Sequence, residues 1–408
     1  MREQHFKAHL VTRLWARPLA ALALAALLGA CAGGIPSTVQ VEYTPEELVP
    51  ERAPFYTRGD VNQLPPVDPL ALDDDMHAFL DDIQARSGSP RVVLNNILRG
   101  LLGEGTVIEY DNFKTYTAQE TFHARQGNCL AFTNLFVALA REAGLDVVYQ
   151  EVDIPHNWER RGETWVYNRH ISAFVDLDME GEFFIDFNLN PTQVELYDAR
   201  RISDRAALSQ YHNNMGVYWI MGERYDLAYL HLQEAIRLAN NESWFWTNLG
   251  VLYSRVHDDK RAEAAWLHAV DLANDHTAES NLARYYRRIG ELELAEIFQE
   301  RVQRFRLKNP YYRYELAETA YYSGDYETAI RELKAAIRIR ENDEHFHRLL
   351  GLAYVRTGAG DKASASFAAA EEVTKNKVAR QVYSEKQKIL RQGIATRQVP
   401  EPETVPPE

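Results

Sequence analysis

Cys129 combines a reactive side chain with the helix position that most favours its reactivity. It is one of only two cysteines in the 408-residue chain. Asn128 is a preferred helix N-cap residue, apolar residues recur at helical spacing through residues 130–143, and Gly144 is typical of a helix end. Cys129 would then be the first residue of a helix, where unpaired backbone N–H groups and the positive end of the helix dipole favour a thiolate. The alternative is a small buried core residue.

His170 and Asp186 are polar residues in two otherwise apolar, strand-like segments, separated by the polar turn 176–181. If the loop holds an odd number of residues and pairs Val175 with Gly181, His170 lies directly opposite Asp186. Their Cβ atoms would then be roughly 4.5–5.5 Å apart, close enough for a carboxylate to hold an imidazole. A two-residue turn would instead put the two side chains on opposite faces of the hairpin.

Several elements are expected around these residues. Helices over residues 73–85 and 90–101 should pack on the Cys129 helix, and residues 147–152 alternate as a further strand. The stretch 108–117 is expected to be a loop that lines a cleft. Its aromatic residues are Tyr110, Phe113 and Tyr116.

The order Cys, His, Asp on a helix and two strands resembles the transglutaminase-like domain, a branch of the papain-like cysteine fold. The resemblance covers about residues 92–190. It rests on Gly127-x-Cys129 at the helix start, Ala143-Gly144-Leu145 at its end, His170 before an apolar strand, and Asp186 after Phe183-Phe184-Ile185. It implies that Cys129 is the nucleophile, His170 the base and acid, and Asp186 the residue that orients His170.

Such a triad transfers acyl groups. The thiolate attacks an amide or ester carbonyl and forms an oxyanion, which collapses to a thioester. The backbone N–H of Cys129 and the side chain of Gln126 are candidate donors to that oxyanion. Water or an amine could then take the acyl group, and the sequence favours neither. His170 as a core histidine and Asp186 as a turn cap are the alternatives. We expect no metal and no cofactor.

The N-terminus has the pattern of a bacterial lipoprotein signal. Basic residues precede an apolar run at 19–28 that is too short to span a bilayer. Leu28-Gly29-Ala30-Cys31 resembles a lipobox, which implies removal of residues 1–30 and lipidation of Cys31. Because Ala32 follows that cysteine, we expect an outer-membrane lipoprotein facing the periplasm. The formal net charge of −14 argues against nucleic-acid binding.

Five similar segments follow from residue 209, with matching small residues 34, 33, 34 and 34 positions apart. This period resembles the tetratricopeptide repeat, a helix pair that buries its apolar face by stacking on the next pair. The resemblance implies a solenoid with a groove for a protein or peptide partner. The small residues of the first helices are Gly216, Gly250, Ala283, Ala317 and Gly351.

The expected organisation is an α+β transglutaminase-like (papain-like) domain followed by an all-α tetratricopeptide-repeat solenoid. The expected boundaries are a signal peptide at 1–30, a Pro-rich tether at 31–69, the α+β domain at 70–208, the repeats with a capping helix at 209–394, and a disordered tail at 395–408. The apolar segment 191–210 should pack against both domains as a short helix or strap.

Two functions fit this organisation. One is a membrane-anchored periplasmic cysteine-dependent amide hydrolase or acyl transferase whose repeats bind a protein or envelope substrate. The other is a non-catalytic envelope scaffold that uses the papain-like fold and the repeats only to bind proteins.

Overall fold

The computed structural model describes residues 34–391, apart from 58, 84–87, 104–108, 153–157, 162–163, 168–169, 188–198 and 375–376. The signal peptide, Cys31 and the tail at 395–408 lie outside the described residues. The chain divides into two compact units, residues 1–299 and 300–408. No helix in the described ranges is both long and apolar enough to cross a bilayer.

Helix α6 (Cys129–Glu142) is the centre of the α+β domain, and its middle residues are buried on every side. Helices α3 (Asp74–Asp82), α4 (Pro90–Leu102) and α5 (Ala118–Ala124) share its core, as the sequence pattern predicts for the first two. A helix that is apolar all round must be covered on all sides. The surrounding elements therefore hold α6, and with it Cys129, in a fixed position.

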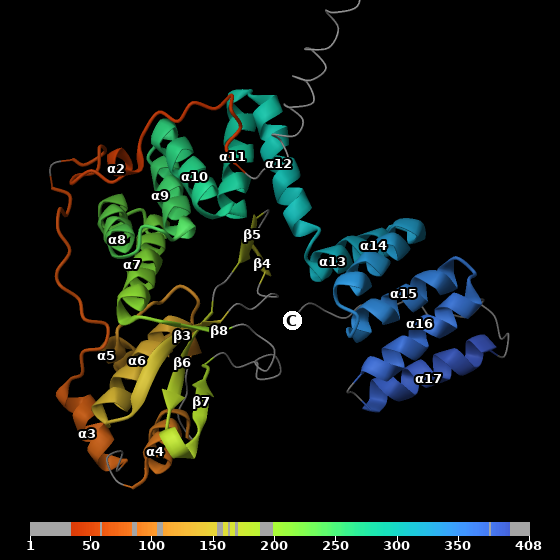
Figure 1. Ribbon diagram of the computed structural model, residues 1–408, viewed down its shortest axis with the longest axis horizontal. Helices are drawn as coiled ribbons and strands as arrows, with labels where there is room; N and C mark the ends of the chain where they lie inside the picture. The colour runs from red at the N-terminus through yellow and green to blue at the C-terminus, as the bar shows by residue number, and fades with distance from the viewer. Residues whose placement is uncertain are drawn as a thin grey trace, which may run out of the picture. The chain divides into compact units, whose positions relative to one another are not determined.

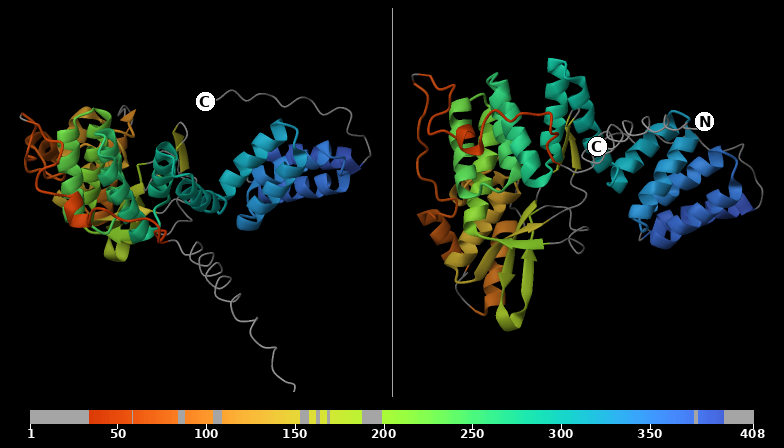
Figure 2. Two further views of the ribbon diagram at one scale, coloured as in Figure 1. Left: turned by 90° about the horizontal axis from the view of Figure 1, so that it is seen from above. Right: turned by 45° about the horizontal axis from the view of Figure 1, so that its top comes forward.

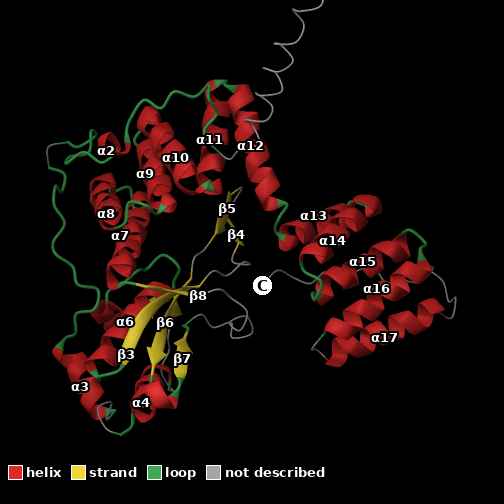
Figure 3. Ribbon diagram, in the orientation of Figure 1, coloured by secondary structure: helices red, strands yellow, loops and turns green. Residues whose placement is uncertain are grey.

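The opposite side of α6 packs on a four-stranded antiparallel sheet (Figures 1 and 3). Its strand order is β7 (Glu182–Ile185), β6 (His170–Asp176), β3 (Asp146–Val152) and β8 (Ala199–Ile202). Two small pairs accompany it, β1 (Glu109–Tyr110) with β2 (Gln126–Gly127) and β4 (Trp158–Arg161) with β5 (Thr164–Tyr167).

The register of the β6–β7 hairpin differs from the expected one. Val175 pairs with Phe183 and not with Gly181, because the loop of residues 177–181 contains the short 3₁₀ turn Asp178–Glu180. The loop still holds an odd number of residues, so the alternation of faces is as expected. His170 and Asp186 are therefore diagonal neighbours on one face and not directly opposed, which long side chains can still bridge.

The described part of the segment between the two domains adds an edge strand and then a helix. Strand β8 pairs with β3, and Ser203 caps α7 (Asp204–Met221) through its hydroxyl. Arg141 of α6 makes two hydrogen bonds to Asp204, at 2.7 and 2.9 Å. Residues 199–210 are packed as expected, but as an edge strand and the start of the first repeat helix and not as a short helix or strap, while 191–198 lie outside the described residues. The first repeat helix begins before the expected residue 209.

Helix pairs follow along the rest of the chain. In residues 1–299 they are α7 with α8 (Tyr225–Leu238) and α9 (Ser243–Arg255) with α10 (Asp259–Ala273), followed by α11 (His276–Ile289). Helix α12 (Leu292–Arg306) spans the division between the units. In residues 300–408 they are α13 (Pro310–Tyr322) with α14 (Tyr326–Ile339) and α15 (Glu344–Arg356) with α16 (Gly360–Val373), then α17 (Lys377–Arg391).

The repeated small residues let the paired helices approach closely. A Cβ added at Gly216 would lie 2.6 Å from Leu232, and one at Gly250 would lie 2.5 Å from the Trp266 ring. Contacts that short do not occur between real side chains, so a larger residue at these positions would force the helices apart. The small residues that recur about every 34 positions thus mark the sites where the two helices of a pair are closest.

Part of the segment expected to be a Pro-rich tether is packed on the repeats. Helix α2 (Pro45–Leu48) lies beside the first repeats and contacts α10 (Figures 1 and 2). Leu48 is fully buried among the side chains of these repeats. The hydroxyls of Tyr253 and Tyr229 donate to the carbonyls of Leu48 and Pro50, each at 2.6 Å. This segment is therefore a bound strap, a name used here for residues 35–57 and 59–61, and not a spacer.

Replacing Leu48 with alanine tests this contact. We expect Leu48→Ala to lower the free energy of unfolding by about 2–5 kcal/mol, because it leaves a cavity in the repeat core. Val41→Ala, at a residue of the same segment that is 47% exposed, should change it by less than about 0.5 kcal/mol. Urea unfolding followed by tryptophan fluorescence measures both. Equal stabilities for the two variants would mean that the segment is a free tether after all.

Candidate active site

The loop before α6 fixes the position of Cys129. Asn128 is the N-cap, and its Oδ1 accepts a hydrogen bond from the backbone N–H of Ala131 at 3.0 Å. Its own N–H donates to the carbonyl of Lys114 at 2.9 Å. A Cβ at Gly127 would lie 2.6 Å from the Cβ of Ala131, so only glycine fits there. Cys129 is the first residue of the helix, as the sequence predicts.

A threonine one turn further along ties the start of α6 to the sheet. The hydroxyl of Thr133 lies 2.8 Å from the carbonyl of Cys129 and 3.3 Å from the carbonyl of Ile171 in β6. Thr133 is fully buried. Because Ile171 follows His170, this bridge holds the first turn of α6 next to the start of β6. The cysteine and the histidine are thereby brought to the same place from distant parts of the sequence.

His170 and Asp186 form a short hydrogen bond, with Nε2 of His170 2.6 Å from Oδ1 of Asp186. The His170 side chain is only 3% exposed and that of Asp186 10% exposed. Asp186 lies one residue beyond β7, where the side chain reaches diagonally across the hairpin. The two residues predicted to interact do so, although in a register different from the expected one.

Cys129 and His170 are also hydrogen-bonded to one another. His170 therefore interacts with Asp186 and with Cys129 at the same time. Burial alone would raise the pKa of Cys129, but the hydrogen bond and charge of His170, with smaller contributions from the Ile171 N–H and the Tyr110 hydroxyl, lower it below its usual value.

The pKa of His170 moves in the opposite direction. Burial acts to lower it, yet the hydrogen bonds to Asp186 and Cys129 outweigh that effect and raise the pKa to about 10. A lowered thiol pKa next to a raised imidazole pKa favours a thiolate–imidazolium pair at neutral pH. This is the reactive form of a cysteine nucleophile.

Tyr110 is a further residue at this site, although its position in the sequence predicts only that it lines a cleft. Its hydroxyl hydrogen-bonds to the sulfur and to the backbone N–H of Cys129. The contact arises from the parallel pairing of Tyr110 with Gly127, two residues before the cysteine. A two-residue parallel pair leaves no periodic signal in the sequence. The aromatic loop 108–117 was the only clue.

Gln126, the candidate oxyanion donor from the sequence, lies in β2 beside the same site. Its Oε1 accepts a hydrogen bond from the ammonium of Lys114. A role in catalysis would require its amide nitrogen to donate to the substrate, and that role stays a prediction.

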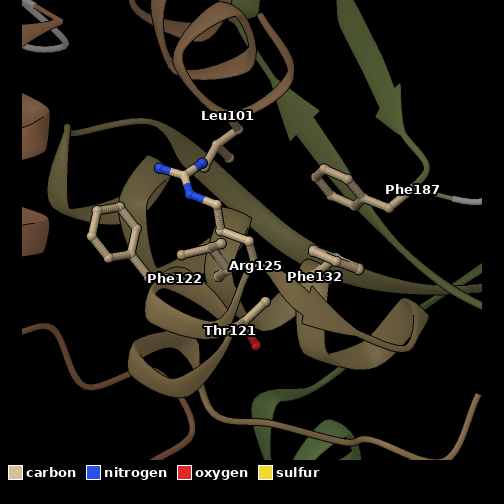
Figure 4. A pocket seen from close by; sticks show the side chains of 7 residues that line it. Leu101, Thr121, Phe122, Arg125, Phe132 and Phe187 are labelled. Atoms are coloured by element: carbon tan, nitrogen blue, oxygen red, sulfur yellow. The ribbon is translucent and has the colours of Figure 1, made fainter. Parts of the chain in front are cut away.

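A small hollow lies between α4, α5 and α6, close to the residue after Asp186 (Figure 4). Its volume of about 20 Å³ is enough for about one water molecule. The rings of Phe132 and Phe187 form one side, with centroids 6.0 Å apart, and the Arg125 side chain extends towards Leu101 on the other. Its size suits packing around α6 and not a substrate.

Two known families match parts of the chain. Residues 94–181 match the transglutaminase-like superfamily, and residues 317–358 match the TPR (tetratricopeptide) repeat. The chain therefore contains a transglutaminase-like domain followed by a tetratricopeptide-repeat region. The first match includes Cys129 and His170 and ends before Asp186. No curated protein matches the chain.

Solved structures similar to the chain include MamA, from position 41 to its end, of Desulfovibrio magneticus RS-1. It is 19% identical, with a TM-score of 0.24, over 42% of this chain and 96% of that one. The C-terminal part of a TPR repeat-containing protein from Cytophaga hutchinsonii is 16% identical, with a TM-score of 0.25, over 47% of this chain and 88% of that one. TM-scores this low support no inference about the arrangement of the whole chain.

The pH dependence of Cys129 alkylation tests the electrostatics of the site. In the folded chain we expect iodoacetamide to react with Cys129 well below the pH at which a free cysteine ionises, because its pKa is lowered. Asp186→Asn removes the charge that raises the pKa of His170 and so weakens the imidazolium. The thiol pKa should then rise, and alkylation at low pH should slow by about tenfold.

Asp178→Asn is the matched control, because it removes the same charge from an exposed position in the loop of the same hairpin. Its pH profile should be that of the unmodified chain. A thiol that titrates like free cysteine in all three proteins would show that no ion pair forms.

Proposed function

We propose that this chain, with its transglutaminase-like domain before tetratricopeptide repeats, is a cysteine-dependent amide hydrolase or acyl transferase acting on a protein or envelope substrate. The observation that carries the proposal is the continuous hydrogen-bonded series from Asp186 through His170 to Cys129. The order, the chemistry and the geometry of these side chains match the requirements of thiol acyl transfer.

The first half of the reaction forms a thioester. The Cys129 thiolate attacks the carbonyl carbon, a C–S bond forms, and the carbonyl π electrons move to oxygen to give an oxyanion. When the oxyanion collapses, the C–N bond breaks, and the His170 imidazolium gives its proton to the departing amine. Asp186 keeps His170 oriented with the proton-carrying nitrogen directed at the sulfur and the leaving group.

The second half transfers the acyl group to an acceptor. Neutral His170 removes a proton from water or from a primary amine as that acceptor attacks the thioester carbonyl. The C–S bond then breaks and the thiolate is restored beside the imidazolium. With water the net reaction is hydrolysis, and with an amine it is acyl transfer.

The burial of the site favours catalysis over the scaffold alternative. A charged pair as enclosed as His170 and Asp186 loses its hydration, and an apolar pair of similar size is often at least as stable in such a position. The chain also contains a His–Asp pair with the same type of contact, His123 with Asp73 at 2.7 Å, but those side chains are 50% and 30% exposed. Only the enclosed pair is hydrogen-bonded to a cysteine.

The repeats support protein binding, since stacked helix pairs form extended surfaces that commonly hold peptides or partner proteins. For localisation we propose that Cys31 is lipidated and anchors the chain in the cell envelope, facing the periplasm. The strap begins to pack on the repeats at Ile35. Four residues span at most about 14 Å, so a lipid on Cys31 would hold the repeat surface near the membrane.

An acyl-enzyme assay tests the catalytic proposal. The folded chain mixed with p-nitrophenyl acetate should release a burst of one nitrophenolate per chain and carry one acetyl group on Cys129, detected by peptide mass spectrometry. His170→Asn should slow acylation by about 10²–10⁴-fold, because the base is lost. His123→Asn, which breaks the exposed His–Asp pair, should acylate at the normal rate.

A chain that folds but gives no burst and no acetylated Cys129 would leave the scaffold function as the better interpretation. Adding a primary amine to the acylated protein distinguishes hydrolysis from transfer, because a transferase releases the acetylated amine in place of acetate.

The lipid anchor has a separate test. Expressed in a Gram-negative host, the chain should appear in the membrane fraction with fatty acid on the fragment that begins at Cys31. Cys31→Ser should move it to the soluble fraction. Ser37→Ala, an exposed change close by in sequence, should leave it with the membranes. An unlipidated chain that still fractionates with membranes would contradict the proposed anchor.

A further inference from the structure

The hydroxyl of Tyr110 contacts Cys129 at two of its atoms. It accepts a hydrogen bond from the backbone N–H of Cys129 and donates one to the sulfur of the same residue. The backbone N–H of a nucleophile at a helix start is the donor that a tetrahedral intermediate uses. Tyr110 therefore occupies the space between the attacking atom and the first oxyanion donor.

Backbone hydrogen bonds hold Tyr110 in this place. The N–H of Glu109 donates to the carbonyl of Arg125, and the N–H of Asp111 donates to the carbonyl of Gly127, both at 3.0 Å. These two bonds flank Tyr110 and join β1 to the loop that leads into α6. Tyr110 as a whole is 38% exposed, while its hydroxyl is hydrogen-bonded to Cys129.

The hydroxyl remains protonated under working conditions. Burial, followed by the negative charge of the Cys129 thiolate, raises the pKa of Tyr110 above its usual value. A neutral phenol has one O–H to donate and an oxygen that accepts. In the free protein the proton is directed at the sulfur, which carries the negative charge.

We propose that Tyr110 is a catalytic residue that donates its O–H to the substrate oxyanion, an inference that rests on the acyl-transfer function proposed above. When the thiolate attacks, the C–S bond forms and the negative charge moves from sulfur to the carbonyl oxygen. The sulfur becomes a poor acceptor, and the substrate oxygen takes the Cys129 N–H. The phenol then loses both of its former partners and turns its O–H to the new anion, while its proton stays on the phenol oxygen.

This geometry favours Tyr110 over Gln126 as the side-chain donor. The Tyr110 hydroxyl already touches both the sulfur and the N–H of Cys129. Gln126 contacts Lys114 through its oxygen. The competing interpretation is that Tyr110 only covers the cysteine and must leave before a substrate binds. The two interpretations predict opposite effects when the hydroxyl is removed.

The experiment compares two reactions of Cys129 in the folded full chain. Acetylation by p-nitrophenyl acetate passes through an oxyanion, whereas alkylation by iodoacetamide is a direct displacement at carbon and forms none. Tyr110→Phe should reduce the acetylation rate by about 10²–10³-fold, the usual loss for one oxyanion donor. At a pH where the thiol is fully ionised, its alkylation rate should stay within about threefold of the unmodified chain. Tyr218→Phe, the same chemical change at an exposed position in α7, should alter neither rate.

Other outcomes overturn the proposal in distinguishable ways. If Tyr110→Phe acetylates at the normal rate or faster, and alkylates faster, then Tyr110 is a cover and not a donor. If both rates fall together, the hydroxyl acts on the thiolate alone. If the unmodified chain alkylates rapidly but never acetylates, the acyl-transfer function itself fails, and the role of Tyr110 fails with it.

Discussion

The site depends on one short hydrogen bond between a nearly enclosed imidazole and a nearly enclosed carboxylate. His170 is the first residue of β6, and Asp186, 2.6 Å away, follows directly after the adjacent strand β7, so the pairing of these two strands sets their separation. Little water reaches either group to compensate its charge. Their mutual attraction and the attraction to the thiolate must supply what hydration no longer does. The elements around His170 and Asp186 must therefore keep the thiolate close to the imidazole.

Helix α6 keeps the sulfur of Cys129 close to His170. Cys129 is its first residue, its cap Asn128 is held by Lys114 and Thr115, and Thr133 joins its first turn to β6. These contacts leave the sulfur little freedom to move away from His170. For the acyl transfer proposed here, such preorganisation would lower the cost of reaching the transition state, because the groups need not be reoriented during the reaction.

Much of this could be predicted from residue types and alternation. The helix start at Cys129 follows from Asn128 and the apolar period, and the shared face of His170 and Asp186 follows from counting residues across the hairpin. The register was wrong by one pair, because the 3₁₀ turn at Asp178–Glu180 moves the closing pair to Asp176 and Glu182. The contact of Tyr110 with Cys129 could not be predicted, because strands of two residues each leave no periodic pattern in the sequence. The prediction that the strap is a tether was wrong, because a proline-rich sequence is compatible with an extended segment bound to a surface as well as with a spacer.

The union of the two domains within residues 1–299 is a consequence of where α7 is buried. Ala207 and Tyr211 of that helix belong to the core around α6, while Ile220 near its other end belongs to the core of the repeats. This helix of 18 residues thus contributes side chains to two hydrophobic cores. The Arg141–Asp204 ion pair and the β3–β8 pairing hold its first turn against the α+β domain. A hinge between the site and the first repeats would have to break a helix and expose apolar surface. A partner bound on α7 to α11 would therefore be held at a set position relative to Cys129. Its effective concentration at the thiol would be fixed by structure and not by the length of a flexible linker.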